Sequence, residues 1–174
     1  FLAASALYIA RVLYGYHPAD PAWSHSASGA VTGNPGGVLG AYLSDLLLYL
    51  FGFSAWWVVL FMLQRVWVGY RELRADSIFS KRTLWVSIAG FVALLLASSA
   101  MEAIRLYTLT AELPLAPGGM LGAVLGDALA RVFGFTGATL LLLTMIATSF
   151  SVFSGLSWLR FVDSLGERIE TLYQ

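Results

Sequence analysis

The ionisable residues that stand among apolar ones are the first candidates for chemistry in this chain. Glu102 and Arg105 lie three residues apart near the end of an apolar run, and Asp45 and Asp127 each lie in another apolar stretch. A charge is costly to remove from water, so such residues are functional candidates unless they reach water or a partner. Glu102 and Arg105 are close enough to the end of their run to reach outward to water or to pair with each other. We therefore favour a structural role for both.

The residues that usually hold metals, cofactors or nucleotides are scarce. His17 and His25 lie eight residues apart in one polar loop, where a metal site completed by Asp20 is conceivable but ordinary loop histidines are the better interpretation. There is no cysteine, so no thiolate ligand or cysteine nucleophile exists. Lys81 is the only lysine and Arg82 follows it, whereas a phosphate-binding loop needs Ser or Thr after its lysine. We expect no catalytic residue, no metal and no cofactor in this chain.

The amino-acid composition indicates the class of protein in which these residues lie. Of 174 residues, 59% are apolar and 11% are charged, against about 45–50% and about 25% in soluble domains. So few charges cannot cover a water-facing surface. The formal net charge is +0, which excludes a basic nucleic-acid-binding surface for the chain as a whole. The composition predicts an all-α integral membrane protein.

Apolar stretches predict where the chain crosses the membrane. Two of them, 37–70 and 119–161, are too long for one crossing, because about 20 residues span the hydrocarbon core. Each contains a glycine between two phenylalanines, Gly52 and Gly134, and glycine weakens a helix interior by about 1 kcal/mol. We therefore predict a short interfacial helix before each glycine, about 37–51 and 119–133. The four predicted transmembrane helices are about 1–14, 53–70, 84–107 and 136–158. Six crossings, with each short helix also spanning, is the less favoured alternative.

The distribution of Lys and Arg predicts the orientation. Loops 15–36 and 108–118 contain neither residue type, whereas the loop 71–82 and its flanks are rich in them. The positive-inside rule then places the loop 71–82 and both chain ends in the cytoplasm and the other two loops in the periplasm. The residues that determine this topology are Arg65, Arg71, Arg74, Lys81 and Arg82.

An internal repeat relates the two halves of the chain. At a shift of 82 residues, most positions between 36 and 53 are identical to those between 118 and 135. Such a match indicates a tandem duplication, with repeat 1 at about 1–70 and repeat 2 at about 84–160. Two crossings per repeat give both repeats one orientation, which argues against the inverted repeats common in secondary transporters.

The repeated segments supply candidate packing surfaces. Glycines four residues apart allow two helix backbones to approach closely, either within the chain, which we favour, or between copies. Asp45 and Asp127 occupy matching positions in the two repeats. They are either polar contact points or, as we favour, residues turned to headgroups and water. Asp127 precedes Arg131 by four residues, which is the favourable order for an ion pair on one face of a helix. The candidate helix-packing or oligomer-interface residues are Gly36, Gly37, Gly40, Asp45, Gly52, Gly118, Gly119, Gly122, Gly126, Asp127 and Gly134.

A loop motif gives a family resemblance. The run from Tyr16 to Ser24 contains Pro18, Asp20, Pro21, Trp23 and Ser24. This run, with the segments 34–37 and 153–158, resembles the N-terminal membrane domain of FtsK-type DNA translocases of bacterial cell division.

The resemblance implies a function that the residues alone do not. It implies a four-span anchor in the bacterial inner membrane at the division septum, assembled as hexamers and in contact with lipids and other cell-division proteins. It also implies a cytoplasmic motor beyond residue 174 that hydrolyses ATP and pumps DNA, so we expect this chain to be part of a longer one and to make no direct nucleic-acid contact. The alternative is a small transporter or channel built from a parallel two-helix duplication.

Overall fold

The computed structural model describes residues 1–24, 32–75, 81–108 and 113–155. Within these ranges all regular structure is helical. The elements are α1 (Leu2–Tyr14), α2 (Gly37–Phe51), the short 3-10 helix η1 (Gly52–Ala55), α3 (Trp56–Ala75), α4 (Lys81–Arg105) and α5 (Gly119–Ser154).

Glycine determines where the long apolar stretches change direction. Gly52 separates α2 from η1 with φ 60° and ψ −138°, and Gly134 interrupts α5 with φ 69° and ψ 169°. A side chain makes this part of backbone space unfavourable, so glycine is the residue that can turn the chain here. Helix α5 therefore consists of two straight parts, 119–133 and 135–154. Both turns lie at the Phe-Gly-Phe sequences.

Among the described residues, three helical stretches are long and apolar enough to cross a membrane. They are Gly37–Arg71, Leu84–Arg105 and Gly119–Ser154, and the first and last include the turns at glycine. Helix α1 is also apolar, but its 13 residues are shorter than a crossing needs.

The described helices differ from the expected ranges mainly at their ends. Helix α3 continues to Ala75 and α4 begins at Lys81, so most of the expected loop 71–82 is helical. Arg, Lys and Glu are good helix formers, and hence a helix can continue beyond its apolar part. Arg65, Arg71 and Arg74 lie on α3. Lys81 and Arg82 begin α4.

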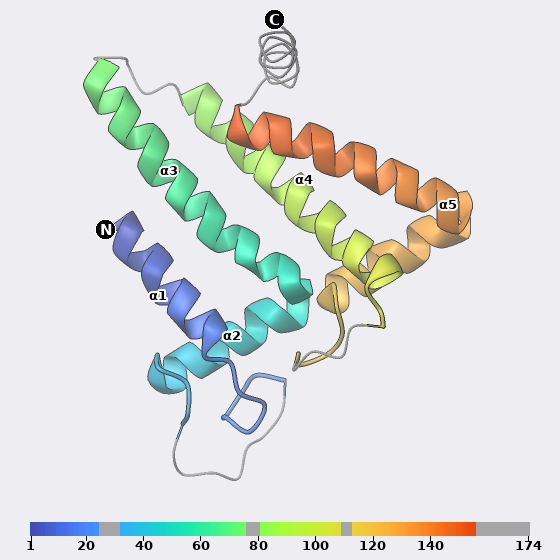
Figure 1. Ribbon diagram of the computed structural model, residues 1–174, viewed down its shortest axis with the longest axis horizontal. Helices are drawn as coiled ribbons and strands as arrows, with labels where there is room; N and C mark the ends of the chain where they lie inside the picture. The colour runs from blue at the N-terminus through green and yellow to red at the C-terminus, as the bar shows by residue number, and fades with distance from the viewer. Residues whose placement is uncertain (25–31, 76–80, 109–112, 156–174) are drawn as a thin grey trace, which may run out of the picture.

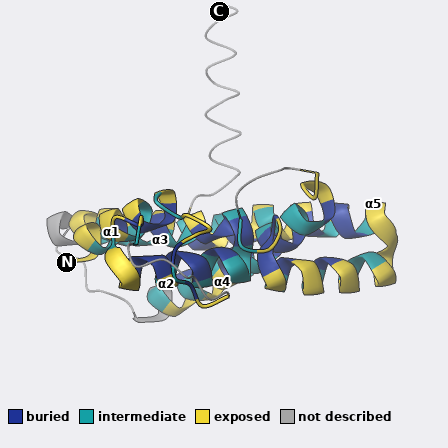
Figure 2. Cartoon of the chain, turned by 90° about the horizontal axis from the view of Figure 1, so that it is seen from below, coloured by how far each residue is buried: buried dark blue, intermediate teal, exposed yellow. Residues whose placement is uncertain are grey.

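The helices form one thin layer (Figure 1 and Figure 2). Helix α1 packs beside α3, and α4 packs beside α5. Helix α2 crosses the lower ends of α1 and α3 in Figure 1, and the first part of α5 crosses the lower end of α4. Each half of the chain therefore has a pair of neighbouring helices and a short helix across one end of the pair.

The buried side chains form one cluster in each half. Leu13, Leu48, Ala55 and Val59 join α1, α2, η1 and α3. The other cluster joins α4 and α5, and it contains Ala97, Ala100, Ile104, Ala138 and Leu142. Its small alanines allow the close approach of helix backbones that stabilises helix pairs in membranes.

Aromatic rings connect α3 to the other half. Phe61 of α3 stacks on Phe91 of α4 with ring centroids 4.5 Å apart, and both rings contact Phe153 of α5. The side-chain amide of Gln64 donates a hydrogen bond of 3.3 Å to the Phe153 carbonyl. Large rings thus fill the space between α3 and its neighbours.

Candidate functional site

The two halves of the chain meet backbone to backbone at glycines, at a place we call the junction. It consists of Gly52, Ser54, Ser99, Glu102, Gly118 and Gly119. A Cβ on Gly119 would lie 2.6 Å from the Phe51 nitrogen, and a Cβ on Gly52 would lie 2.9 Å from the Gly119 nitrogen. Real Cβ atoms essentially never come this close to backbone. Glycine is therefore required here for close approach as well as for positive φ.

Glu102 of α4 binds both sides of the junction. Its Oε1 accepts a hydrogen bond of 2.5 Å from the Ser54 hydroxyl, and its Oε2 accepts one of 3.0 Å from the Gly118 amide. Gly118 directly precedes α5, at a helix end where N–H groups lack intrahelical partners and a negative group is favoured. Glu102 thus connects Ser54 of η1 to the start of α5.

Ser99 is a second contact between the halves. Its hydroxyl lies 3.2 Å from the Phe51 carbonyl and 2.8 Å from the Leu95 carbonyl, and the residue is fully buried. A Cβ on Gly122 would collide with the backbone of Ser99. Small residues therefore bring α5 onto α4 at this point.

Glu102 and Arg105 do not pair with each other, and Arg105 is exposed whereas Glu102 is half-buried. Glu102 is directed into the junction, and Arg105 donates a hydrogen bond of 3.1 Å to the Thr139 hydroxyl and lies 4.2 Å from the centre of the Phe135 ring. Neither the expected mutual pair nor outward reach describes Glu102, because its two oxygens bind Ser54 of the first repeat and Gly118 of its own repeat. Sequence spacing could not have found those partners.

The Gly-x-x-x-Gly surfaces pack within the chain. A Cβ on Gly36 would lie 2.6 Å from Val12 Cγ2, and a Cβ on Gly40 would lie 3.1 Å from the same atom, so this pair faces α1. Gly122 and Gly126 face α4 in the same manner. Each short helix therefore uses its glycines against the helix that precedes it.

Asp45 and Asp127 have different environments despite their matching sequence positions. Asp45 is 0% exposed, and its two oxygens accept hydrogen bonds of 2.8 Å from the backbone amide and the hydroxyl of Ser24. Asp127 forms an exposed ion pair of 2.6 Å with Arg131. Turning to headgroups and water is thus the wrong interpretation for Asp45, because its helix is covered by the chain's own loop.

The loop motif has a structural role in the described part of the loop. Asp20 is buried and accepts hydrogen bonds from the amides of Gly33 and Asn34, at 2.6 and 2.8 Å. Trp23 packs edge-on against Tyr49 of α2. Pro18 is exposed, and Pro21 is half-buried. The motif closes the loop and holds it on α2.

Asn34 has a structural capping role that the sequence motifs did not predict. Its amide donates to the carbonyls of Val12 and Gly15 at 3.0 and 3.1 Å, and its carbonyl accepts from the Gly36 amide at 2.9 Å. Asn34 thereby satisfies the last carbonyls of α1 and the first amide before α2. Its place before Pro-Gly-Gly was the available signal, since Asn is common at such caps.

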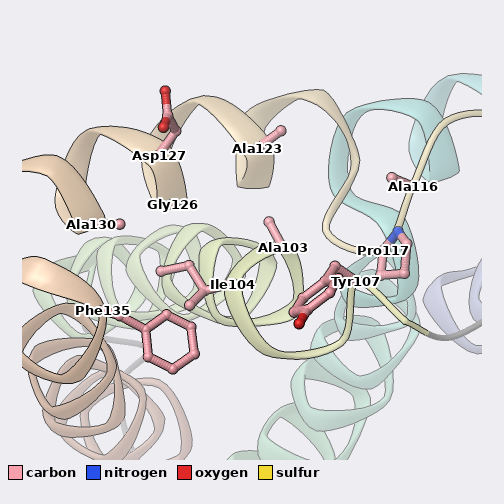
Figure 3. Close-up of a pocket in the computed structure, with 10 residues that line it drawn as sticks. All are labelled: Ala103, Ile104, Tyr107, Ala116, Pro117, Ala123, Gly126, Asp127, Ala130 and Phe135. Carbon is pink, nitrogen blue, oxygen red and sulfur yellow. The ribbon is translucent and has the colours of Figure 1, made fainter.

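A pocket of about 360 Å³ lies between the end of α4 and the first part of α5 (Figure 3). Ile104 and Phe135 contribute apolar side chains, and the carboxylate of Asp127 points away from them. Among the described residues no group of three His, Asp or Glu could hold a metal ion. Asp20 is already bound to amides, and His25 lies outside the described residues. Whether His17, His25 and Asp20 could together hold a metal ion therefore stays untested.

Comparison with known proteins gives the family. The family model described as the 4TM region of DNA translocase FtsK/SpoIIIE matches residues 1–166. The chain is 42% identical to a protein named DNA translocase FtsK 2 from Ralstonia nicotianae, over 99% of this chain and 23% of the relative. It is 32% identical to DNA translocase FtsK of Shewanella oneidensis, over 92% of this chain and 17% of the relative.

A third relative, DNA translocase FtsK of Pseudomonas syringae pv. tomato, is 31% identical over 98% of this chain and 21% of the relative. The chain thus spans about a fifth of the length of these relatives. No solved structure matches it. Because the family model covers nearly all of the sequence, the chain belongs to the family of the 4TM region of FtsK/SpoIIIE DNA translocases.

Proposed function

We propose that this chain is the membrane anchor and oligomerisation domain of a DNA translocase that acts at the division septum. Family membership over residues 1–166 is the observation that carries the proposal. The three apolar helical stretches agree with an anchor in the bacterial inner membrane. ATP hydrolysis and DNA pumping belong to a motor outside this chain, and this chain is non-catalytic.

Four crossings in two parallel repeats complete the proposal. In support, Gly37 and Gly119 have similar φ values, 64° and 61°, and so do Gly52 and Gly134, with 60° and 69°. Helix α2 and the first part of α5 lie across the ends of their neighbours, as expected for helices at an interface (Figure 1). The start of α1, the end of α3, the start of α4 and the end of α5 all lie on one side in Figure 1, as cytoplasmic ends require.

The junction supports an anchor more than a transporter. Its carboxylate and hydroxyl groups bond to one another and to backbone. A transporter needs convergent polar groups around a cavity. The residues around the pocket in Figure 3 are mostly apolar, and the carboxylate of Asp127 points away from Ile104 and Phe135.

Fusion reporters test the proposed topology. A fluorescent protein that folds only in the cytoplasm is placed after residue 174, and a phosphatase active only in the periplasm is placed there in a parallel fusion. Further fusions at 76–80 and 109–112 probe the two loops. We expect fluorescence after 174 and within 76–80, and phosphatase activity within 109–112. Phosphatase activity after residue 174 would refute the proposed orientation.

Cell imaging tests the septal location. The chain fused to the fluorescent protein is compared with an unrelated four-span protein that carries the same fusion. We expect the chain to concentrate at the division site while the control is spread over the membrane. Equal distributions of the two fusions would refute septal targeting by this chain. Assembly is tested by the mass of the chain in lipid nanodiscs, where a defined oligomer is expected and a monomer would refute the oligomerisation role.

A further inference from the structure

The guanidinium of Arg105 is held in place at the end of α4. Its Nε donates a hydrogen bond of 3.1 Å to the Thr139 hydroxyl, and its Cζ lies 4.2 Å from the centre of the Phe135 ring. These two contacts fix one edge and one face of the group. The N–H donors on its two Nη atoms make no hydrogen bond to the described residues, and the side chain is exposed. Arg105 therefore presents a positioned set of donors to the surroundings of the chain.

The charge of Arg105 is not neutralised within the described part of the chain. Glu102, on the same helix, binds Ser54 and Gly118. Asp127, on the first part of α5, forms its ion pair with Arg131. Arg105 itself forms no ion pair with a described carboxylate. A positive charge beside apolar helices is costly unless it meets water or an anion, and Arg105 can therefore accept an anion from outside the chain.

The pocket between α4 and the first part of α5 lies directly beside this cation. Phe135, whose ring carries the guanidinium, also lines the pocket, as does Ile104, the residue before Arg105 (Figure 3). The volume of about 360 Å³ falls in the range of sites that take small molecules, about 300–1,000 Å³. Most of the lining residues are apolar. An apolar space with a cation at its edge fits an amphiphile that has an anionic head and an apolar tail.

The place of the pocket in the membrane selects a phospholipid among such amphiphiles. The proposed crossings put the end of α4 and the first part of α5 at the periplasmic interface, where lipid phosphates meet the upper acyl chains. Tyr107 lines the same pocket and is 70% exposed, and tyrosine is typical of the headgroup level. The planar guanidinium matches the oxygens of a phosphate. Because Asp127 and Arg131 neutralise each other, the net positive charge of Arg105 favours an anionic headgroup over a zwitterionic one.

We propose that Arg105 and this pocket form a binding site for an anionic phospholipid of the outer leaflet. The phosphate binds the Nη groups of Arg105, and the upper part of an acyl chain occupies the space beside Ile104 and Phe135. The inference rests on the proposed function, because the depth of the site follows from the proposed crossings. The bound lipid fills the gap between the two helices and links the bend of α5 to the end of α4.

Photo-labelling with lipid probes tests this site in the full chain. The chain is placed in nanodiscs of phosphatidylcholine that contain a minor fraction of a phosphatidylglycerol with a photoreactive group in the upper part of one acyl chain. A second sample contains the same acyl chains on a phosphatidylcholine head. After illumination, mass spectrometry of peptides locates the labels. We expect the phosphatidylglycerol probe to label the pocket residues Ile104, Tyr107 or Ala130 about fivefold more than the phosphatidylcholine probe, the factor for one basic side chain against an anionic lipid.

Two pairs of variants separate the head of the lipid from its tail. Arg105→Gln is expected to remove the preference for the phosphatidylglycerol probe. Its control is Arg11→Gln, which removes an exposed arginine from the last turn of α1, outside the pocket lining. Ala130→Phe fills the pocket and is expected to lower labelling by both probes. Its control is Ala128→Phe, an exposed position on the same helix that does not line the pocket. Both controls are expected to keep the labelling of the unaltered chain.

The comparison of the two probes on the unaltered chain needs no substitution, so it decides even where a variant fails to fold. Equal labelling of the pocket by both probes would overturn the inference. So would an unchanged preference in Arg105→Gln, an equal loss in Arg11→Gln, or equal losses in Ala130→Phe and Ala128→Phe. These results leave the anchor intact, because they are obtained with chain already in a bilayer. Phosphatase activity after residue 174 in the fusion experiment would instead refute the proposed orientation.

Discussion

Gly52→Ala and Gly134→Ala form a matched pair of substitutions that measures the strength of the junction. Both glycines turn the chain at a Phe-Gly-Phe sequence, with φ values of 60° and 69°. Alanine at either place enters backbone space that side chains disfavour, at a cost of about 1–3 kcal/mol. This cost is common to both variants and cancels when they are compared.

The difference between the two variants comes from close approach. A Cβ at Gly52 would lie 2.9 Å from both Gly118 Cα and the Gly119 nitrogen, whereas a Cβ at Gly134 meets no described atom within 4 Å. The backbones at the junction must therefore separate in Gly52→Ala. Separation weakens the bonds of Glu102 to Ser54 and Gly118, and one or two bonds to a charged group correspond to about 2–5 kcal/mol.

Thermal unfolding of the monomeric fraction in mild detergent measures this difference. For a chain of this length, about 2–5 kcal/mol corresponds to roughly 5–15 °C in Tm. We therefore expect Gly52→Ala to unfold at a temperature lower by that amount than Gly134→Ala. Working with monomers removes any contact that Gly134 makes with a second copy. Equal Tm values, or a lower Tm for Gly134→Ala, would refute the junction as a major source of stability.

Three further predictions concern polar residues. Asp45→Asn is expected to lower the free energy of unfolding by about 1–3 kcal/mol, because it removes the charge and one of the two acceptor oxygens that bind the amide and the hydroxyl of Ser24. Exposed Asp127→Asn is expected to change it by at most about 0.5 kcal/mol. Thermal melts compare the two, and equal losses would contradict the burial of Asp45. Asn34→Ala is expected to accelerate hydrogen exchange at the amides beside the α1–α2 connection, and unchanged exchange there would contradict its capping role. Glu102→Ala is expected to accelerate exchange at Gly118 and leave the amide of Gly40 unchanged as the control; equal rates at Gly118 in both proteins would show that the carboxylate does not hold it.

The sequence predicted where the long apolar helices turn, but it did not predict which helix surfaces contact each other. Glycine between two phenylalanines predicted both turns because the residue type alone permits positive φ there. The helices are apolar on all sides, so no polar stripe distinguished the face that the chain covers. For that reason the burial of Asp45 against Ser24 was missed, and its matching position misleadingly suggested the same environment as Asp127.

Contacts across the repeats were beyond the reach of local reasoning. Glu102 and Arg105 were judged by their distance from the end of an apolar run, which says nothing about Ser54, 48 residues away. The spacing of Gly118 and Gly122 predicted a close backbone approach, but the partner, Ser99, depends on how α5 lies on α4. Four crossings, the orientation and the assembly stay predictions.

The aromatic contacts and the junction connect the same two halves with unequal stiffness. At the junction, backbone rests on backbone, so no side-chain rotation can take up a displacement. Toward the other end, Phe61, Phe91 and Phe153 separate α3 from its neighbours, and rings can slide over one another. A swing of about 5° about the junction would move the far end of the 20-residue α3, roughly 30 Å long, by about 3 Å. A small rotation at the junction would thereby become a lateral displacement at the far end of α3.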